Sequence, residues 1–206
     1  MPLKFANNQS LTSTTALPSA VPTDNLILIS TQTASNSSSI SFTSGLDSTY
    51  DMYEFKFINL HPNTDVKFLG FQASTNGGST YATTITSTYF YAIHSESDST
   101  YFAYEAGYDL AQGTSLYSGG QPLSDNIGSD SDQSVCGTLQ LFNPSSATYV
   151  KHFISNTSAY THDDTETNSY VAGYFNTTSA INAIKFYFRD SANFDGIIKM
   201  YGVKKS

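Results

Sequence analysis

Strict alternation of apolar and polar residues near the end of the chain is the feature that most limits the fold. Between residues 184 and 189, apolar and polar side chains take turns as Ile184, Lys185, Phe186, Tyr187, Phe188 and Arg189. A repeat of two residues is that of a half-buried β-strand, whose successive side chains point to opposite faces. Aromatic and β-branched runs at 170–175 and 196–201 flank this segment, so residues 170–203 are predicted to form three strands. Because the last of them lies so near the end, we expect it to close the sheet.

Short runs of the same kind recur along the rest of the chain. They predict further strands near residues 26–31, 39–43, 52–59, 66–73, 81–86, 88–94, 101–106, 135–142 and 148–155. Turn-forming segments such as SGLDST, HPNTD, TNGGST and FNPSS separate them. About ten to twelve short strands without a credible helix predict an all-β fold, a jelly-roll-like antiparallel β-sandwich. No long linker divides the pattern, so residues 25–206 are expected to form one domain.

Residues 1–24 have a different character and are predicted to form an extended N-terminal arm. Three prolines disfavour regular structure in this segment. Two interpretations stay open: a loose tail, or an arm that lies along a neighbouring subunit. In the second case the contacts would be made by apolar residues that follow no helical or strand period, namely Leu3, Phe5, Leu11 and Leu17.

Composition excludes several classes of partner. Aromatic residues make up 14% of the chain and charged residues only 13%, which indicates an aromatic β core under an uncharged polar surface. The net charge is −8 and no basic patch is present, so binding to nucleic acid is not expected. No apolar run approaches the roughly 20 residues of a membrane span. The lone Cys136 lies in the apolar run VCGTLQLF and is predicted to be a buried, unreactive thiol.

Sequence motifs give no support for catalysis. Acidic loops around Asp130 and at 162–166 lack the ligand spacing of a calcium loop, and the four histidines form no paired metal-ligand spacing. No nucleophile elbow, phosphate-binding loop or Cys-His pair is present. The chain is therefore predicted to be no enzyme and to need no metal or cofactor.

Contact with other molecules is the more promising role. Residues 111–134 form the longest stretch without strand character, and such loops often contact another chain. Tyrosines crowd the middle of the chain, where a flat ring with a hydroxyl can pack at an interface or stack on a sugar. Besides the arm, the predicted interface residues are Tyr101, Tyr104, Tyr108, Leu116, Tyr117 and Ile127.

Several segments resemble small virion proteins of tailed bacteriophages, especially those of marine bacteria. They are MPLKFANNQSL, ISFTSGLDSTYDMYEFKFINLHPNTD, LQLFNPSSATYVKHFIS and AGYFNTTSAINAIKFYFRDSANFDGIIKMYGV. The resemblance implies a structural protein made in the host cytoplasm and located in the virion. Its partners would be other capsid or tail proteins and further copies of itself, with a trimer as a common form for such modules.

The family covers head decorations, tail components and fibre tips, so two roles stay open. The first, which we favour, is decoration or cementing of the capsid through contacts between subunits. The alternative is a tail-fibre or tail-tip module that binds glycans of the host surface.

Overall fold

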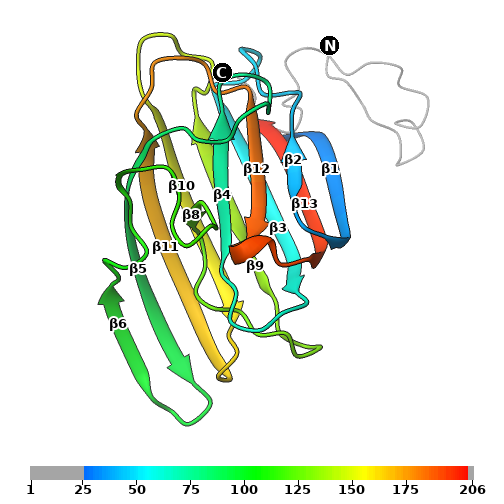
Figure 1. Cartoon of the computed structure of the whole chain (residues 1–206), viewed down its shortest axis with the longest axis vertical. Coiled ribbons are helices and arrows are strands. Elements are labelled where there is room, and N and C mark those ends of the chain that lie inside the picture. The colour runs from blue at the N-terminus through cyan, green and yellow to red at the C-terminus, as the bar shows by residue number, and fades with distance from the viewer. Residues whose placement is uncertain (1–25, 204–206) are drawn as a thin grey trace, which may run out of the picture.

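Residues 26–203, which the computed structural model describes, form two antiparallel β-sheets packed face to face (Figure 1). The larger sheet contains β1 (Leu26–Ser37), β3 (Met52–Pro62), β5 (Ile85–Ser95), β6 (Thr100–Tyr104), β7 (Ala111–Gly113), β9 (Val135–Phe142), β10 (Lys151–Tyr160), β11 (Thr165–Phe175) and β13 (Phe194–Val203). The smaller sheet contains β2 (Ile40–Phe42), β4 (Leu69–Ser74), β8 (Gln121–Pro122) and β12 (Ala183–Phe188). The predicted all-β sandwich is confirmed.

The strand order explains how the two sheets are joined. In the large sheet it is β1-β13-β3-β9-β10-β11-β5-β6, with β7 also paired to β5, and in the small sheet it is β2-β12-β4-β8. The chain passes repeatedly from one sheet to the other. The C-terminal strand β13 lies between β1 and β3, so it joins the first strand to the rest of the sheet instead of closing an outer edge.

Most predicted strands are present, with four differences. One is that residues 111–134, expected to lack strand character, contain the short strands β7 and β8. Residues 81–84 are not in a strand, and β5 is one strand of eleven residues where two were predicted. β11 begins at Thr165, five residues before the predicted start. Its first half, TETNS, lacks apolar alternation because its buried residues are themselves polar: Thr165, Thr167 and Ser169.

The core is a connected group of phenylalanine rings that joins the sheets. Phe186 of β12 contacts Phe55 and Phe57 of β3, each at 5.2 Å between ring centroids. Phe71 of β4 in turn contacts Phe153 of β10 at 4.9 Å. Edge-to-face and tilted pairs of this kind stabilise a core beyond the area that they bury. Because Phe186 and Phe71 also contact each other at 6.2 Å, one ring network spans both sheets.

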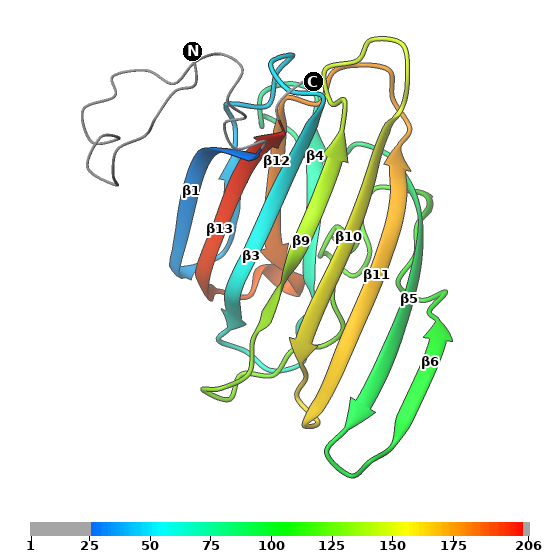
Figure 2. The ribbon, with the colours of Figure 1, turned by 180° about the vertical axis from the view of Figure 1, so that it is seen from behind.

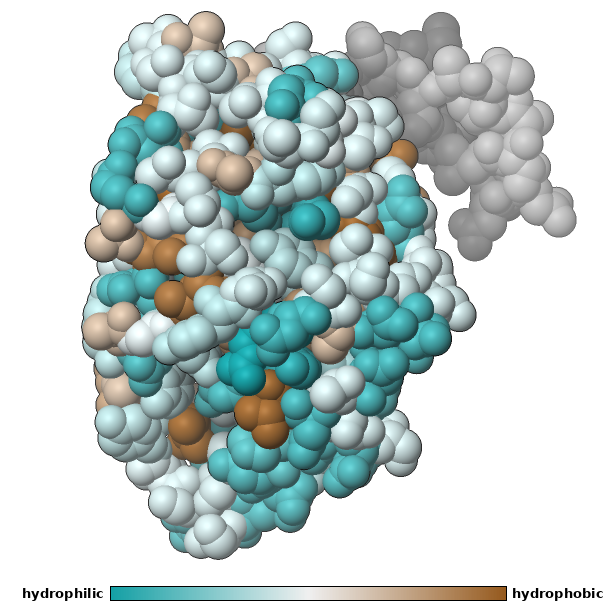
Figure 3. Space-filling model, viewed as in Figure 1, coloured by the Kyte–Doolittle hydropathy of each residue, from teal (hydrophilic) through white to brown (hydrophobic). Residues whose placement is uncertain are grey.

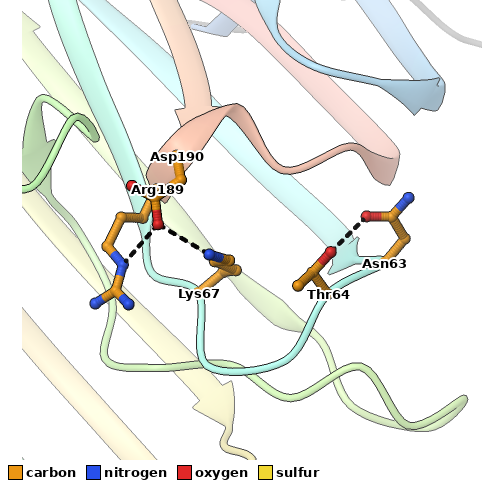
Figure 4. Close-up of polar contacts among 5 residues, drawn as sticks. All are labelled: Asn63, Thr64, Lys67, Arg189 and Asp190. Carbon is orange, nitrogen blue, oxygen red and sulfur yellow. Dashed lines mark hydrogen bonds and ion pairs between the residues drawn. The ribbon is translucent and has the colours of Figure 1, made fainter.

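A turn after β12 is tied to the segment before β4. Asp190, in the 3-10 turn η2 (Arg189–Ser191), accepts a hydrogen bond from Lys67 Nζ at 2.9 Å and one from Arg189 Nε at 3.3 Å (Figure 4). In the same loop, Thr64 Oγ1 donates to Asn63 Oδ1 at 3.2 Å. The hydrogen bond from Lys67 lowers the pKa of Asp190. On this side of the molecule the surface is mostly hydrophilic, with only scattered apolar spots (Figure 3).

The prediction of a buried thiol is wrong. Cys136 is exposed, because it alternates with the buried residues of β9 and so points to the outer face of the large sheet. Its Sγ lies 3.2 Å from Asn59 Oδ1, to which it donates. Within residues 26–203, no helix is long and apolar enough to cross a membrane.

Removing the ring at the centre of the core should be costly. We expect Phe186→Ala to lower the free energy of unfolding by about 3–5 kcal/mol, since it leaves a cavity among several rings. Urea unfolding followed by circular dichroism would measure this. Tyr149→Ala, at a side chain that is 71% exposed, should change the free energy by no more than about 0.5 kcal/mol.

Removing the C-terminal strand should abolish folding. A chain that ends at Asp195 lacks most of β13, which leaves β1 without its partner and β3 with an open edge. It also loses Ile198 and Met200 from the core. We expect no cooperative thermal transition for this chain, and a soluble product that unfolds cooperatively would contradict the proposed importance of β13.

Candidate binding surfaces on the nine-stranded sheet

The large sheet is wider than the small one, so the small sheet leaves part of its inner face uncovered. Residues 105–134 cover some of this remaining surface. Towards the end of β10 and the start of β11, the buried side chains of the inner face are small and mostly polar, among them Thr157, Thr167 and Ser169. Thr157 Oγ1 donates to the carbonyl of Leu123 at 2.6 Å. Ser87 Oγ of β5 donates to Gln121 Oε1 at 2.5 Å. The segment is therefore held both by hydrogen bonds and by apolar contacts, since its residues Leu110, Leu123 and Ile127 are buried in the core.

Two glycines allow this close approach. A Cβ on Gly119 would lie 2.4 Å from the ring of Phe68. Gly120 has a φ of +73°, and a Cβ there would lie 2.3 Å from the carbonyl oxygen of Phe71. Only residues without a side chain fit here. As a result, the middle of the predicted interface loop is packed against its own domain and is not free to contact a partner.

The structure separates the predicted interface residues into different environments. Ile127 is fully buried and forms bridges with Lys67 and Thr161, so it belongs to the core. Leu116 is half-buried against the core. Tyr117, by contrast, is 59% exposed. The arm residues Leu3, Phe5, Leu11 and Leu17 lie outside the described residues.

Tyr108 forms part of a half-buried polar cluster instead of a surface site. Its hydroxyl lies 3.4 Å from Asp125 Oδ1, to which it donates, and accepts a hydrogen bond from Asn126 Nδ2 at 2.9 Å. Burial raises the pKa of Tyr108, and the nearby charge of Asp125 raises it further. Burial likewise raises the pKa of Asp125, although its hydrogen bond from the Asn126 backbone opposes this.

Neutralising Asp125 should stabilise the protein at neutral pH. When folding raises the pKa of a carboxyl group, the free energy of unfolding falls as the pH rises through the pKa of that group in the folded protein. Asp125→Asn should therefore raise the free energy of unfolding at pH 7 by about 0.5–1 kcal/mol. The gain should vanish below the ordinary pKa of 3.8. Urea titrations across this range would measure it, with Asp132→Asn, an exposed carboxyl in the same loop, as the matched control. An equal gain at every pH would contradict the assignment.

The edge strand β6 carries the most exposed aromatic side chains of the large sheet. Tyr101, Phe102 and Tyr104 are 59%, 68% and 54% exposed. Phe102 packs edge-on against Phe90 of β5 at 5.8 Å, and Tyr104 donates a hydrogen bond to Asp109. β6 is the last strand in the sheet order and lies at the outer edge of the molecule (Figure 2). Its sequence, TYFAY, contains neither charge nor proline.

The opposite edge is built differently. β1 is rich in Ser and Thr, and its pairing with β13 is interrupted by register shifts between Leu28 and Ser30 and between Ala34 and Ser37. Bulges and polar side chains are the usual protection of a sheet edge against unwanted pairing. β6 has no such protection, so the two edges of one sheet differ in how readily they could accept a partner.

A hollow lies on the outer face of the large sheet, over β10, β11 and β5. On β11 the large side chains of Tyr170 and Tyr174 point outward on either side of the small Ala172. Ala172 is paired with Ile154 of β10 and Thr88 of β5. Two adjoining cavities of about 460 and 280 Å³ share Ala172 and Ile154. We call this region the Ala172 hollow, and the strands that form it are seen face-on in Figure 2.

The walls of the Ala172 hollow are aromatic. Tyr170 stacks on Phe90 with 5.2 Å between centroids and 11° between planes, which covers one face of the tyrosine ring. At the other end, the ring of Tyr174 lies 6.0 Å from that of His152. Sequence reasoning missed these residues because their proximity depends on which strands pair. The only local signal was the outward alternation of Tyr170 and Tyr174 around a small residue.

An acidic hollow of about 400 Å³ lies at the other end of the same strands. It is lined by His94, Ser95, Glu96, Tyr160, Asp164 and Glu166. The Tyr160 hydroxyl donates to Asp164 at 3.1 Å, which raises the pKa of Tyr160 to about 12. Within residues 26–203, no three His, Cys, Asp or Glu side chains come together in a way that could hold a metal ion.

Comparisons of the chain with protein-family models, with curated protein sequences and with solved structures find no match.

Proposed function

We propose that the chain is a non-enzymatic structural protein of a bacteriophage virion that attaches through contacts between subunits, as a decorating or cementing protein of the capsid. The assignment to a virion is supported by the resemblance of the segments quoted above. The proposed mode of attachment rests on one observation, the unprotected aromatic edge strand β6.

Physical chemistry links such an edge to assembly. The outer backbone groups of a terminal strand can pair with a strand of another chain. Tyrosine and phenylalanine are enriched in protein interfaces, whereas charged residues are depleted from their centres. β6 combines both properties, because Tyr101 and Phe102 are more than half exposed and no charge lies within the strand. Further copies of this chain, or a neighbouring virion protein, would bury these rings.

A second candidate function is recognition of host-surface glycans by a tail-fibre or tail-tip module. The Ala172 hollow favours it, since exposed tyrosine rings beside a cavity can stack on sugars. Location on the particle separates the two candidates. Cryo-electron microscopy of purified particles should find regular copies over the head if the protein decorates the capsid. Density confined to the tail tip would favour the second candidate, and absence from the particle would contradict both.

Substitution of the exposed rings of β6 should weaken self-association. We expect the double variant Tyr101→Ser, Phe102→Ser to dissociate to monomers at concentrations at which the unmodified protein is oligomeric, because each lost ring removes buried apolar area. Sedimentation velocity would measure this. Tyr149→Ser, which removes an equally exposed ring away from β6, serves as the control. An unchanged oligomer in the double variant, with native circular dichroism, would rule out β6 as the contact.

A further inference from the structure

The shape of the Ala172 hollow follows from the order of side chains on one strand. Successive residues of β11 alternate between faces, so Tyr170, Ala172 and Tyr174 point outward in a row. At the usual rise of a strand, the two tyrosine Cα atoms are about 13 Å apart. The methyl group of Ala172 forms a floor between two rings that stand above it. Ile154 on one side and Thr88 on the other complete a recess, not a flat face.

The chemistry of the lining is mixed in a particular way. Apolar surface comes from the free face of Tyr170, from Tyr174 and from Ile154, which is 51% exposed. Hydrogen-bonding groups come from the hydroxyls of the tyrosines, Thr86 and Thr88, from the amide of Asn156 and from the imidazole of His152. Apart from the tyrosines, His152 is the only titratable side chain among the lining residues. A ligand that presents C–H-rich flat surfaces together with uncharged hydroxyl groups fits this lining. Pyranose rings have both.

The charged side chains near the Ala172 hollow indicate whether a bound sugar would be charged or neutral. The acidic hollow with Glu96, Asp164 and Glu166 lies at the far end of the same strands, and the whole chain carries a net charge of −8. Two lysines point to this face of the sheet, Lys56 on β3 and Lys199 on β13. Both strands lie beyond β9, which separates them from β10 and the hollow. Within residues 26–203, no lysine or arginine lines the hollow to pair with a uronic acid or a sulfate, and the negative field disfavours anions.

We propose that the Ala172 hollow binds an uncharged oligosaccharide, with sugar rings packed on Tyr170 and Tyr174 and hydroxyls bonded to the polar groups between them. The site adjoins the β6 edge, because Phe90, which stacks on Tyr170 in the hollow, also contacts Phe102 of β6. This inference deepens the second candidate function, but it concerns binding by the isolated protein and does not depend on where the protein lies on a particle. A second flat sheet face would leave the recess empty, so face-to-face packing of two copies fits it less well.

Filling the hollow tests the proposal directly. The full-length protein would be titrated by calorimetry and NMR with short neutral oligosaccharides of glucose, galactose, mannose and xylose, and with oligogalacturonate and alginate fragments as charged comparators. We expect a neutral oligosaccharide to bind and the charged ones not to.

Ala172→Trp should weaken this binding at least tenfold, or about 1.4 kcal/mol. Ala172 is exposed, so the added ring does not enter the core. Thr31→Trp, at an exposed residue of the edge strand β1, should leave the affinity unchanged.

A second pair of variants separates stacking from hydrogen bonding. Tyr174→Ala should also weaken binding about tenfold, whereas Tyr174→Phe, which keeps the ring, should retain most of the affinity. Circular dichroism and thermal unfolding of each variant would show that the fold is intact.

Three results would overturn the inference. The first is that no neutral oligosaccharide binds at millimolar concentration. The second is that Ala172→Trp binds the oligosaccharide as tightly as the unmodified protein does. The third is that Ala172→Trp loses self-association instead of sugar binding, which would make the hollow a subunit contact. These outcomes are independent of the virion proposal. Failure to bind sugar leaves location on the particle to be decided by microscopy, and absence from the particle leaves sugar binding intact.

Discussion

The ring network around Phe186 is the interaction on which the rest of the structure depends. It joins β12 of the small sheet to β3 of the large sheet, and through Phe71 it reaches β10. No disulfide supports the fold, since the chain has one cysteine. The two sheets are therefore held together by apolar packing. The rings determine which strands come together, and the strand order in turn fixes the positions of the outward-facing side chains.

The unequal width of the two sheets has a structural consequence. Four strands cannot cover nine, so part of the inner face of the large sheet is covered by residues 105–134. That part combines polar groups such as Thr157 and Gln121 with the buried Leu123. The half-buried Asp125, whose pKa is raised by burial, lies in the same region. A long loop that sequence reasoning assigned to a partner is thus largely occupied in completing its own domain.

What remains for contact with other molecules is the outside of the large sheet and its β6 edge. Both proposals use surfaces that the core leaves open, and they use different chemistry. The β6 edge offers exposed rings and a terminal backbone row, which suits another protein chain. The Ala172 hollow offers rings beside hydroxyl and amide groups in a recess, which suits a sugar. One domain could therefore hold a partner at its edge and leave its face free.

The fold class and much of the strand pattern follow from the amino-acid sequence alone. Alternation of apolar and polar residues between 184 and 189 is a local property, since the period of two is set by the backbone of the strand alone. Local patterns failed in the first half of β11, where the buried residues are polar. They also failed for Cys136, because the sequence did not show to which face of the sheet its side chain points. Of the residues predicted to lie at an interface, Tyr101 and Tyr104 are exposed, whereas Ile127 lies in the core. Only the tertiary structure decided that Ile154, Thr88 and Ala172 meet, because strand order is set by packing between distant segments and no local pattern records it.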